Sequence, residues 1–459
     1  MRQSQKTEQQ ADRLSRIGLE NRKYTRARST GYGEGKGMSV TIQDLVLDRN
    51  NLNQAYLRVK RNKGAAGVDD MTVNDLLPYL RENKTELIAS LREGKYKPAP
   101  VKRVEIPKPN GGVRRLGIPT VVDRMVQQAV AQILTPIFER FFSDNSFGFR
   151  PHRGAHDAIS KVVDLYNQGY RRVVDLDLKA YFDNVNHDLM IKYLQQYIDD
   201  PWRLIRKFLT SGVLDHGLFA KSEKGTPQGG RPLSPLLANI YLNELDKELT
   251  RRGHHFVRYA DDCNIYVKSQ RAGERVMRSI TQFLEKRLKV KVNPDKTKVG
   301  SPLRLKFLGF SLGVDNNGAY ARPAKQSQQR VKKALKLLTK RNRGISLTRM
   351  FEEIHRKMRG WLQYYSIGKL TNFIQRLDKW LRVRIRQYIW KQWKKFKTKV
   401  TNLQKLGLSQ HDAYVFASTR KGYWRTAHSK TLSYSLTNRK LEQLGLMNMS
   451  KTLQSIQCD

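Results

Sequence analysis

Two adjacent aspartates, Asp261 and Asp262, are the residues whose type and spacing most directly suggest chemistry in this chain. Short apolar runs flank them at 255–259 and 263–268, which predicts a β-hairpin with the pair at its tip. Neighbouring carboxylates repel each other, and a divalent cation relieves that repulsion. Oxygen ligands and partial hydration suit Mg²⁺. The ordinary alternative is an Asp-rich turn that binds nothing.

A third carboxylate comes from an upstream run that is typical of a strand, RRVVDLDL at 171–178. This run contains Asp175 and Asp177, and Asp183 follows it. Two metal ions held about 3.5–4 Å apart can activate an attacking hydroxyl and stabilise a departing phosphate oxygen. The acidic residues therefore predict phosphoryl transfer, provided that the fold brings the two segments together.

The overall charge indicates a nucleic-acid partner. Among 459 residues, 87 are Lys or Arg and 41 are Asp or Glu, which gives a formal net charge of +46. Such a polycation repels itself when compact unless a polyanion neutralises it, and nucleic acid presents a dense line of phosphates. A membrane surface is the alternative. However, no apolar run approaches the ~18–20 residues of a spanning helix, and the first ten residues contain no signal-like apolar core.

Cysteine usage predicts a reducing compartment. The chain has two cysteines, Cys263 and Cys458, which are too few for a disulfide framework or a Cys-rich zinc site. The nine His residues show no metal-ligand spacing. We therefore expect a cytoplasmic protein with no disulfides and no membrane partner.

The spacing of apolar and turn-forming residues predicts the elements that must position these groups. A β-hairpin with a basic tip is expected over 101–118, with turn-forming residues at 107–112. Other expected elements are helices over 41–57, 70–93, 123–142, 186–211, 233–251 and 272–290, strands over 171–178 and 303–312, and a turn at 293–297.

The last third of the chain differs in composition. Residues 325–400 contain 23 Lys or Arg and three acidic residues. Apolar residues recur at every fourth position from Phe373 to Ile389, which predicts an amphipathic helix, and Trp and Tyr lie among the cations. A solvated helix face is the ordinary alternative. So large an excess of positive charge with interleaved aromatics favours contact with phosphates.

The sequence YADD at 259–262 resembles the YxDD box of reverse transcriptases. The motifs around it resemble, in order, those of the reverse transcriptases encoded by group II introns, the intron maturases. These motifs are IPKP at 106–109 with RRLGIP at 114–119, SFGFRP at 146–151, DLKAYFD at 177–183, GTPQGG at 225–230 with LSPLLAN at 233–239, Asn293 with Lys296 and Thr297, FLGF at 307–310, and GW and YY within 360–365. The resemblance extends from about residue 41 to the C-terminus.

The resemblance implies an α+β fold, a right-hand polymerase with fingers and palm followed by an α-helical thumb. The implied parts are a flexible basic leader at 1–38, an N-terminal extension at 39–95, fingers at 96–172, a palm with the catalytic carboxylates at 173–320, a maturase thumb at 321–400 and a basic C-terminal region at 401–459. The implied function is RNA-directed DNA polymerisation, which extends a DNA or RNA primer on an RNA template with dNTPs. The same chain is expected to be a splicing maturase that binds its parent group II intron RNA.

The roles of the carboxylates follow from the same resemblance. The implied catalytic residues, which are also the implied ligands of two Mg²⁺ ions, are Asp177, Asp261 and Asp262. Asp262 is expected to be the more peripheral of the three. Asp175 and Asp183 match no catalytic position of the family, and we expect structural roles for them.

Contacts to the nucleotide and the nucleic acid are also implied. Phe182 is expected to stack under the incoming sugar and exclude a 2′-hydroxyl, with Tyr181 as the alternative. The other expected nucleotide-binding residues are Arg114, Arg115, Gln228, Gly229 and Lys296. Arg115 is the preferred triphosphate contact, and Lys296 could act as a general acid or merely cap a turn. The expected nucleic-acid-binding residues are Arg150, Arg376, Lys379, Arg382 and Arg386.

Two other functions stay open at the level of sequence. A non-catalytic RNA-binding splicing factor is disfavoured because it has no need of three carboxylates, and a reverse transcriptase of another lineage, such as a retron enzyme, is disfavoured by the basic segment 325–400. Two positions depart from the family pattern. Arg231 adds a residue between the Gly-Gly and Ser-Pro motifs, and Asp70 lies where the family more often has Gly, which disfavours Asp if the backbone there has positive φ.

Overall fold

The computed structural model describes residues 41–107, 113–198, 203–215, 218–221, 223–226 and 232–458. They form two compact units. The first comprises the described residues up to Ser143, Leu178–Glu248 and Gln282–Lys291, and the second comprises Asp144–Asp177, Leu249–Thr281 and the described residues from Val292 onward. The polypeptide therefore passes several times between the units, and the ranges expected for fingers and palm are each divided between them.

The first unit is built on the buried helix α5 (Val121–Glu139), which packs against α3 (Arg49–Asn62). Buried polar groups link these helices, because Asn51 Nδ2 donates to Ala129 O at 3.1 Å and Gln132 Nε2 donates to Asn51 Oδ1 at 2.7 Å. The remaining helices of this unit are α2 (Ile42–Leu47), α4 (Leu76–Arg92), α7 (Tyr181–Asn184), α8 (His187–Leu194), α9 (Arg203–Thr210) and most of α10 (Ser234–Arg251).

A four-stranded sheet in the first unit contains the expected basic hairpin. β1 (Val101–Pro107) pairs antiparallel with β2 (Val113–Ile118), with Lys102 opposite Ile118. β1 also pairs in parallel with β4 (Val213–Asp215), which pairs with β5 (Leu218–Ala220), so the strand order is β2-β1-β4-β5. Residues 108–112 of the expected turn lie outside the described part of the chain.

The second unit contains an antiparallel sheet in the order β6-β7-β3-β8. Its strands are β3 (Arg172–Leu176), β6 (His255–Tyr259), β7 (Asp262–Val267) and β8 (Lys298–Gly300). Helix α6 (Ala155–Asn167) packs against β6. Val173, Val257 and Tyr266 of the sheet share a hydrophobic core with Ile159 and Val162 of that helix. One face of the sheet is therefore buried against α6.

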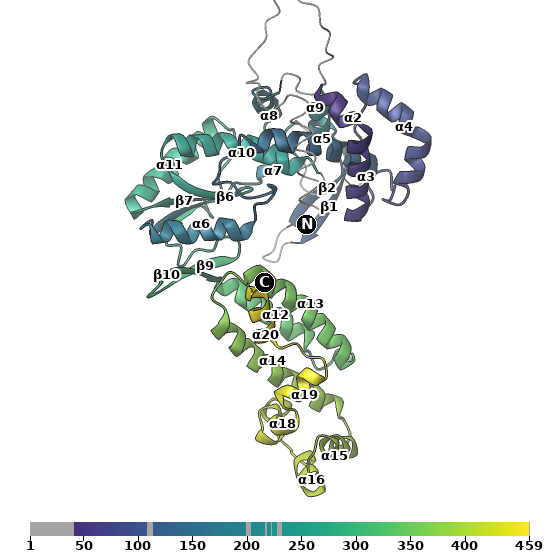
Figure 1. The fold of residues 1–459 in the computed structure, drawn as a ribbon, viewed down its shortest axis with the longest axis vertical. Coiled ribbons are helices and arrows are strands. Elements are labelled where there is room, and N and C mark those ends of the chain that lie inside the picture. Colours follow the sequence, from purple (N-terminus) through teal and green to yellow (C-terminus); the bar gives the residue numbers. More distant parts are fainter. Residues whose placement is uncertain are drawn as a thin grey trace, which may run out of the picture. The chain divides into compact units, whose positions relative to one another are not determined.

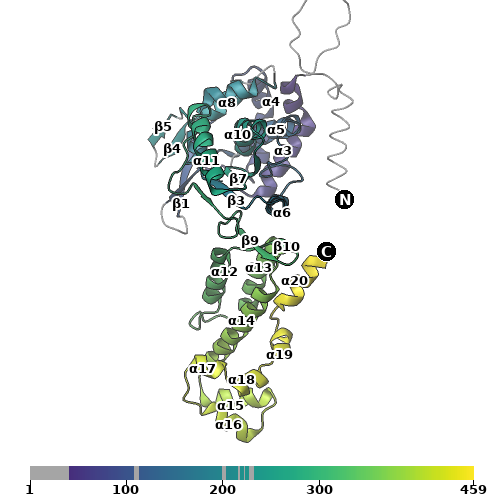
Figure 2. The ribbon, with the colours of Figure 1, turned by 90° about the vertical axis from the view of Figure 1, so that its left-hand side faces the viewer.

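The same unit continues into a hairpin, β9 (Phe310–Asp315) with β10 (Gly318–Pro323), and then into α12 (Lys325–Leu338), α13 (Leu347–Tyr365) and α14 (Thr371–Gln392) (Figure 1). Helix α20 (Met449–Cys458) contacts both α13 and α14 (Figure 2). The remaining helices are α11 (Gln270–Lys286), which has residues in both units, α15 (Phe396–Lys405), α16 (Gln410–Ala417), α17 (Tyr423–Ala427), α18 (Lys430–Ser435) and α19 (Asn438–Gln443). One core cluster extends from α6 to α20, so the amphipathic helices predicted for the last third bury their apolar faces together.

Three expected elements differ from the structure. The helix expected over 41–57 is divided at Asp48, whose carboxylate accepts hydrogen bonds from the next helix's first N–H groups and caps α3. The helix expected over 186–211 is also two helices, α8 and α9. The strand expected over 303–312 is not formed, because Leu308 and Gly309 have φ values of +50° and +81°, which break an extended run before β9 begins.

Within the described residues, no helix combines the length and the apolar character that crossing a membrane requires. Both cysteines are free thiols, Cys263 buried and Cys458 exposed.

Candidate active site

Asp261 and Asp262 lie where β6 turns into β7, as the sequence predicts. Tyr259 pairs with Asp262, so Ala260 and Asp261 form a two-residue turn. Ala260 has φ +58°, a left-handed conformation that disfavours an L-residue by about 1–2 kcal/mol. The turn is therefore strained, and its neighbours must hold it in place.

Arg258 holds this turn from inside the protein. Its side chain is fully buried, and Nη1 donates to Ala260 O at 2.9 Å. Its backbone is also fixed, because Arg258 N donates to Asn145 O at 2.8 Å and Phe147 N donates to Arg258 O at 2.9 Å. The sequence analysis missed this residue, since a buried position on a strand is normally apolar and the pattern gave no signal for a guanidinium.

Gly148 lies directly against the same turn. A Cβ atom at this position would lie 2.3 Å from Ala260 N and 2.9 Å from the carbonyl carbon of Tyr259. Only a residue without a side chain allows the two backbones to approach so closely. The glycine of the SFGFRP motif therefore has a local physical role, which is to support the turn that carries Asp261.

Asp177 follows the end of β3 and reaches the same end of the sheet. Leu176 pairs with Cys263 on β7, and continuing this antiparallel register by one residue brings Asp177 opposite Asp262. The Asp177 Oδ2 atom accepts from Asn293 Nδ2 at 3.0 Å and lies 3.4 Å from Lys296 Nζ. The turn expected at 293–297 thus holds the Asp177 carboxylate by a neutral amide and a cation.

The backbone of Asp177 is fixed by the same turn. Asn293 N donates to Asp177 O at 2.8 Å, and Asp177 N donates to Thr297 Oγ1 at 3.1 Å. The motif that pairs Asn293 with Lys296 and Thr297 is therefore a clamp on Asp177.

The carboxylates lie within one another's electrostatic field. Burial, followed by repulsion from Asp261, Asp175 and Asp177, raises the pKa of Asp262 to about 6. Asp262 is nevertheless an exposed residue, so a cation from solvent can reach it. Burial also raises the pKa of Asp175 to about 6, with Lys298 opposing and Asp177 adding to this shift. The structure thus brings the three predicted catalytic carboxylates together and adds Asp175 beside them.

These carboxylates fit a magnesium ion in donor chemistry. Their ligand atoms are all oxygens, and their mutual repulsion is what a divalent cation relieves. In the described part of the chain, no three acidic, His or Cys side chains already converge as a complete metal site. That is compatible with Mg²⁺, which is commonly held by one or two carboxylates together with waters and substrate phosphates.

The aromatic candidates for the sugar contact lie in the first unit. Phe182 and Tyr181 are both buried, at 8% and 2% relative exposure. Tyr181 Oη donates to Ala238 O at 3.0 Å, so its polar end is already used. Phe182 is therefore the better of the two candidates.

The cationic candidates of the fingers hairpin lie on its surface. Arg114 and Arg115 of β2 are exposed, and Arg115 Nε lies 3.2 Å from Glu105 Oε1.

Asp70 has φ +52°, so this position does require the left-handed conformation, and an aspartate occupies it. The predicted residues Gln228 and Gly229 and the inserted Arg231 lie outside the described residues.

Two arginines expected to contact nucleic acid are buried in the second unit. The Arg382 side chain is 4% exposed and pairs with Asp378 at 2.7 Å and Glu442 at 3.0 Å. Arg386 is also buried, and its Nε donates to Leu436 O at 3.0 Å. These guanidinium groups fasten α14 to the segment around α18 and α19 and are not accessible to a phosphate. They are therefore not retained as nucleic-acid contacts.

The other three expected contacts divide in the same way. Arg150 is buried, and its Nη1 donates to Ser146 O at 2.8 Å, so it too serves the fold. Arg376 and Lys379 are exposed on α14. These two cations are accessible to a phosphate, and their contact with nucleic acid stays a prediction.

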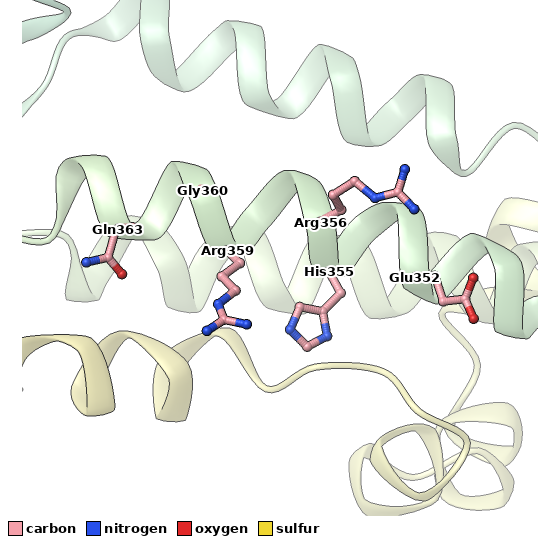
Figure 3. Close-up of a pocket in the computed structure, with 6 residues that line it drawn as sticks. All are labelled: Glu352, His355, Arg356, Arg359, Gly360 and Gln363. Carbon is pink, nitrogen blue, oxygen red and sulfur yellow. The ribbon is translucent and has the colours of Figure 1, made fainter. Parts of the chain in front are cut away.

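Helix α13 presents a cationic face that the sequence analysis did not single out. A depression of about 570 Å³ is lined by Glu352, His355, Arg356, Arg359, Gly360 and Gln363 (Figure 3). Figure 3 shows the His355 and Arg359 side chains on the same side of the helix. All six residues are exposed, so the two arginines can reach a phosphate from solvent.

Comparison with known proteins covers most of the chain. The family model described as reverse transcriptase (RNA-dependent DNA polymerase) matches residues 106–312, and the model of the group II intron maturase-specific domain matches residues 328–407. The first match contains the YADD hairpin and the Asp177 strand. The second contains α13 and α14 with their cations.

Two curated relatives share substantial identity. The group II intron-encoded protein LtrA of Lactococcus lactis subsp. cremoris is 32% identical over 354 residues, which cover 62% of this chain and 58% of LtrA. Protein YkfC of Escherichia coli (strain K12) is 37% identical over 280 residues, which cover 52% of this chain and 73% of YkfC. A solved telomerase structure from Candida albicans, at 13% identity and a TM-score of 0.40 with 79% of this chain and 64% of that chain covered, is too distant to bear on the fold or the function.

The matched part of this chain thus spans less than two thirds of the length of LtrA. The domain order, the catalytic motif and the identity to these relatives agree with one another and with the α+β fold. The chain belongs to the reverse transcriptases of group II introns, in which a reverse transcriptase domain is followed by a maturase-specific domain.

Proposed function

We propose that this chain is an RNA-directed DNA polymerase of a group II intron, which extends a DNA or RNA primer on an RNA template with dNTPs. The observation that carries the proposal is the clustering of Asp177, Asp261 and Asp262 at one end of the β6-β7-β3-β8 sheet, where burial and repulsion raise the pKa of Asp262. A divalent cation relieves the repulsion among these carboxylates, and the net charge of +46 attracts the anionic template, primer and nucleotide.

In this proposal Asp177, Asp261 and Asp262 would hold two Mg²⁺ ions, with Asp262 as the more peripheral residue. Bound there, the ions would supply Lewis-acid stabilisation of the attacking and departing oxygens. Asn293 and Lys296 orient the Asp177 carboxylate through its Oδ2 atom. In this proposal Lys296 also gives a proton to the departing pyrophosphate.

The nucleotide contacts are proposed from the family motifs that contain them. Phe182 contacts the sugar and excludes a 2′-hydroxyl, and Arg114 and Arg115 bind the triphosphate from the surface of β2. Gln228 and Gly229 belong to the same nucleotide-binding set by their motif. Because Arg115 is 3.2 Å from Glu105, it must exchange this exposed ion pair for a phosphate, which requires little free energy at a solvated surface.

We also propose that the chain acts as a splicing maturase that binds group II intron RNA. The match of residues 328–407 to the maturase-specific domain and the exposed cations Arg376 and Lys379 on α14 support this role. In this proposal the parts keep the ranges expected from sequence, with fingers at 96–172, palm at 173–320 and thumb at 321–400.

The polymerase proposal is tested by primer extension on an RNA template with dNTPs and Mg²⁺. We expect extension by the wild type and none above background by Asp261→Ala. A non-catalytic RNA-binding protein is the second candidate. No extension by either protein, with intact RNA binding, would contradict the polymerase and favour that candidate. Equal extension by both proteins would overturn the assignment of Asp261 to catalysis.

A further inference from the structure

The second unit contains a basic pocket that none of the functions above uses. It has a volume of about 500 Å³ and is lined by Lys340, Arg341 and Asn342 from the α12–α13 connection and by Arg384, Gln387 and Lys391 from α14. The three α14 residues are spaced i, i+3 and i+7, so they lie on one face of that helix. We call these six residues the α12–α14 pocket.

The lining of this pocket carries positive charge without an acidic residue. Four of its six residues are cationic and none is acidic. Glu353 of α13 is paired with Arg343, at 2.7 Å. Burial and the neighbouring Arg341 lower the pKa of Arg384 below its ordinary value. Like charges held this close repel each other, and an anion in the pocket would relieve the repulsion.

The cations are held in place rather than mobile on the surface. Arg384 Nε donates to Thr339 Oγ1 at 2.7 Å, and its Nη2 donates to Thr339 O at 3.0 Å, at the C-terminus of α12. Arg341 and Lys391 both lie over the ring of Tyr423, at 4.9 Å and 5.2 Å from its centroid. Side chains that are already ordered lose less entropy when a ligand binds.

Gln387 adds a neutral polar group to the lining of the pocket. It is 8% exposed, it lines the pocket, and among the described residues its amide has no hydrogen-bond partner. An amide carries both a donor and an acceptor. A phosphate only accepts, whereas a ribose 2′-hydroxyl both donates and accepts.

We propose that the α12–α14 pocket binds one ribose–phosphate unit of RNA, with the phosphate against the cations and the 2′-hydroxyl against the amide of Gln387. This assignment rests on the proposed binding of intron RNA by the maturase-specific domain and identifies where part of that binding occurs. A contact to the 2′-hydroxyl would make the domain bind RNA more tightly than DNA, whatever the base sequence.

The test is equilibrium binding of a labelled RNA hairpin, and of the DNA of the same sequence, to the full chain across a series of salt concentrations in EDTA. The double variant Lys340→Gln with Arg341→Gln removes two pocket charges. The double variant Arg275→Gln with Arg278→Gln removes two exposed charges from α11 and is the matched control. Gln387→Met keeps the volume and removes the amide. Thermal unfolding verifies that each variant is folded.

We expect the pocket double variant to weaken RNA binding about tenfold and to reduce the slope of log K against log salt by about 1–2. We expect Gln387→Met to weaken RNA binding about 3–10-fold with an unchanged salt slope, and to leave DNA binding within about twofold, because it removes a neutral hydrogen bond to the 2′-hydroxyl. The control should change neither affinity by more than about twofold.

Equal losses in the pocket and control double variants would overturn the pocket as a specific site. An equal loss of RNA and DNA binding in Gln387→Met, or no loss of either, would overturn the ribose contact. Failure of the wild-type chain to bind RNA would overturn the proposed maturase role, whereas RNA binding by the wild type that the pocket variants leave unchanged would overturn the pocket alone. Binding is measured without dNTPs or metal, so neither result depends on polymerase activity.

Discussion

Substituting Gly148 with Ala should impair catalysis by displacing the turn that carries Asp261. The added Cβ would lie 2.3 Å from Ala260 N, and relieving the contact to an ordinary 3.4 Å requires the two backbones to separate by about 1 Å. Both contacting groups are backbone, so no side chain can rotate away. Overpacking of this kind destabilises a fold by about 1–3 kcal/mol.

The same displacement sets the expected loss of rate. A misplacement of about 1 Å in a catalytic constellation can reduce the rate about 10²-fold. We therefore expect Gly148→Ala to lower single-nucleotide addition at saturating dNTP by about that factor, and to lower the free energy of unfolding by about 1–3 kcal/mol. Rapid-quench primer extension and denaturant unfolding measure the two quantities.

Gly154→Ala is the matched control. It lies in the same segment, it has φ −137°, and a Cβ there would approach no closer than 3.7 Å to a neighbouring atom. This variant should keep a rate within about twofold of the wild type and lose at most about 1 kcal/mol of stability at the N-cap of α6. A Gly148→Ala enzyme that is folded and as fast as Gly154→Ala would refute the reasoning.

Two further predictions concern charge and sugar selection. The pKa of Asp175 is about 6 in the folded chain and 3.8 in the unfolded chain, so the folded state binds more protons between pH 3.8 and pH 6. The free energy of unfolding therefore falls as pH rises through that window. Asp175→Asn should remove the contribution of this residue to the pH dependence, which is at most about 3 kcal/mol in the free energy of unfolding between pH 4 and pH 7. Denaturant unfolding of both proteins in EDTA measures it, and parallel pH profiles of the two proteins would contradict the prediction. Phe182→Ala should raise the incorporation of rNTP relative to dNTP by about tenfold or more in competitive primer extension, and an unchanged ratio would remove Phe182 from sugar selection.

The sequence was sufficient to predict the centre of the site because its signals are local. The alternating runs around Asp261 and Asp262 predicted a hairpin, and a hairpin with a two-residue turn fixes both residues at its tip. The proximity of Asp177 rested on the family resemblance and on its place at the end of a strand. The register that brings it opposite Asp262 depends on pairing between segments 87 residues apart, which no local pattern specifies.

The surface of the thumb was harder to predict because burial there depends on a distant segment. An amphipathic pattern identifies which face of α14 is apolar, but Arg382 and Arg386 are covered by residues around 436–442. Arg258 shows the same limit, since its burial follows from the segment at 145–148 packing beside β6. In each case a distant segment buries an arginine side chain that the sequence pattern predicts to be exposed, and its guanidinium group then forms hydrogen bonds within the fold.

The most direct test of the central claim is the rate of single-nucleotide addition on an RNA template by Asp177→Asn. Asp183→Asn, which neutralises an exposed carboxylate of the same motif, is the control. Loss of a metal-binding carboxylate removes several kcal/mol of transition-state stabilisation, so we expect a fall of about 10³-fold or more in Asp177→Asn and a change of less than about threefold in Asp183→Asn. A folded Asp177→Asn protein that adds nucleotides at the wild-type rate would contradict the assignment of these carboxylates to polymerisation.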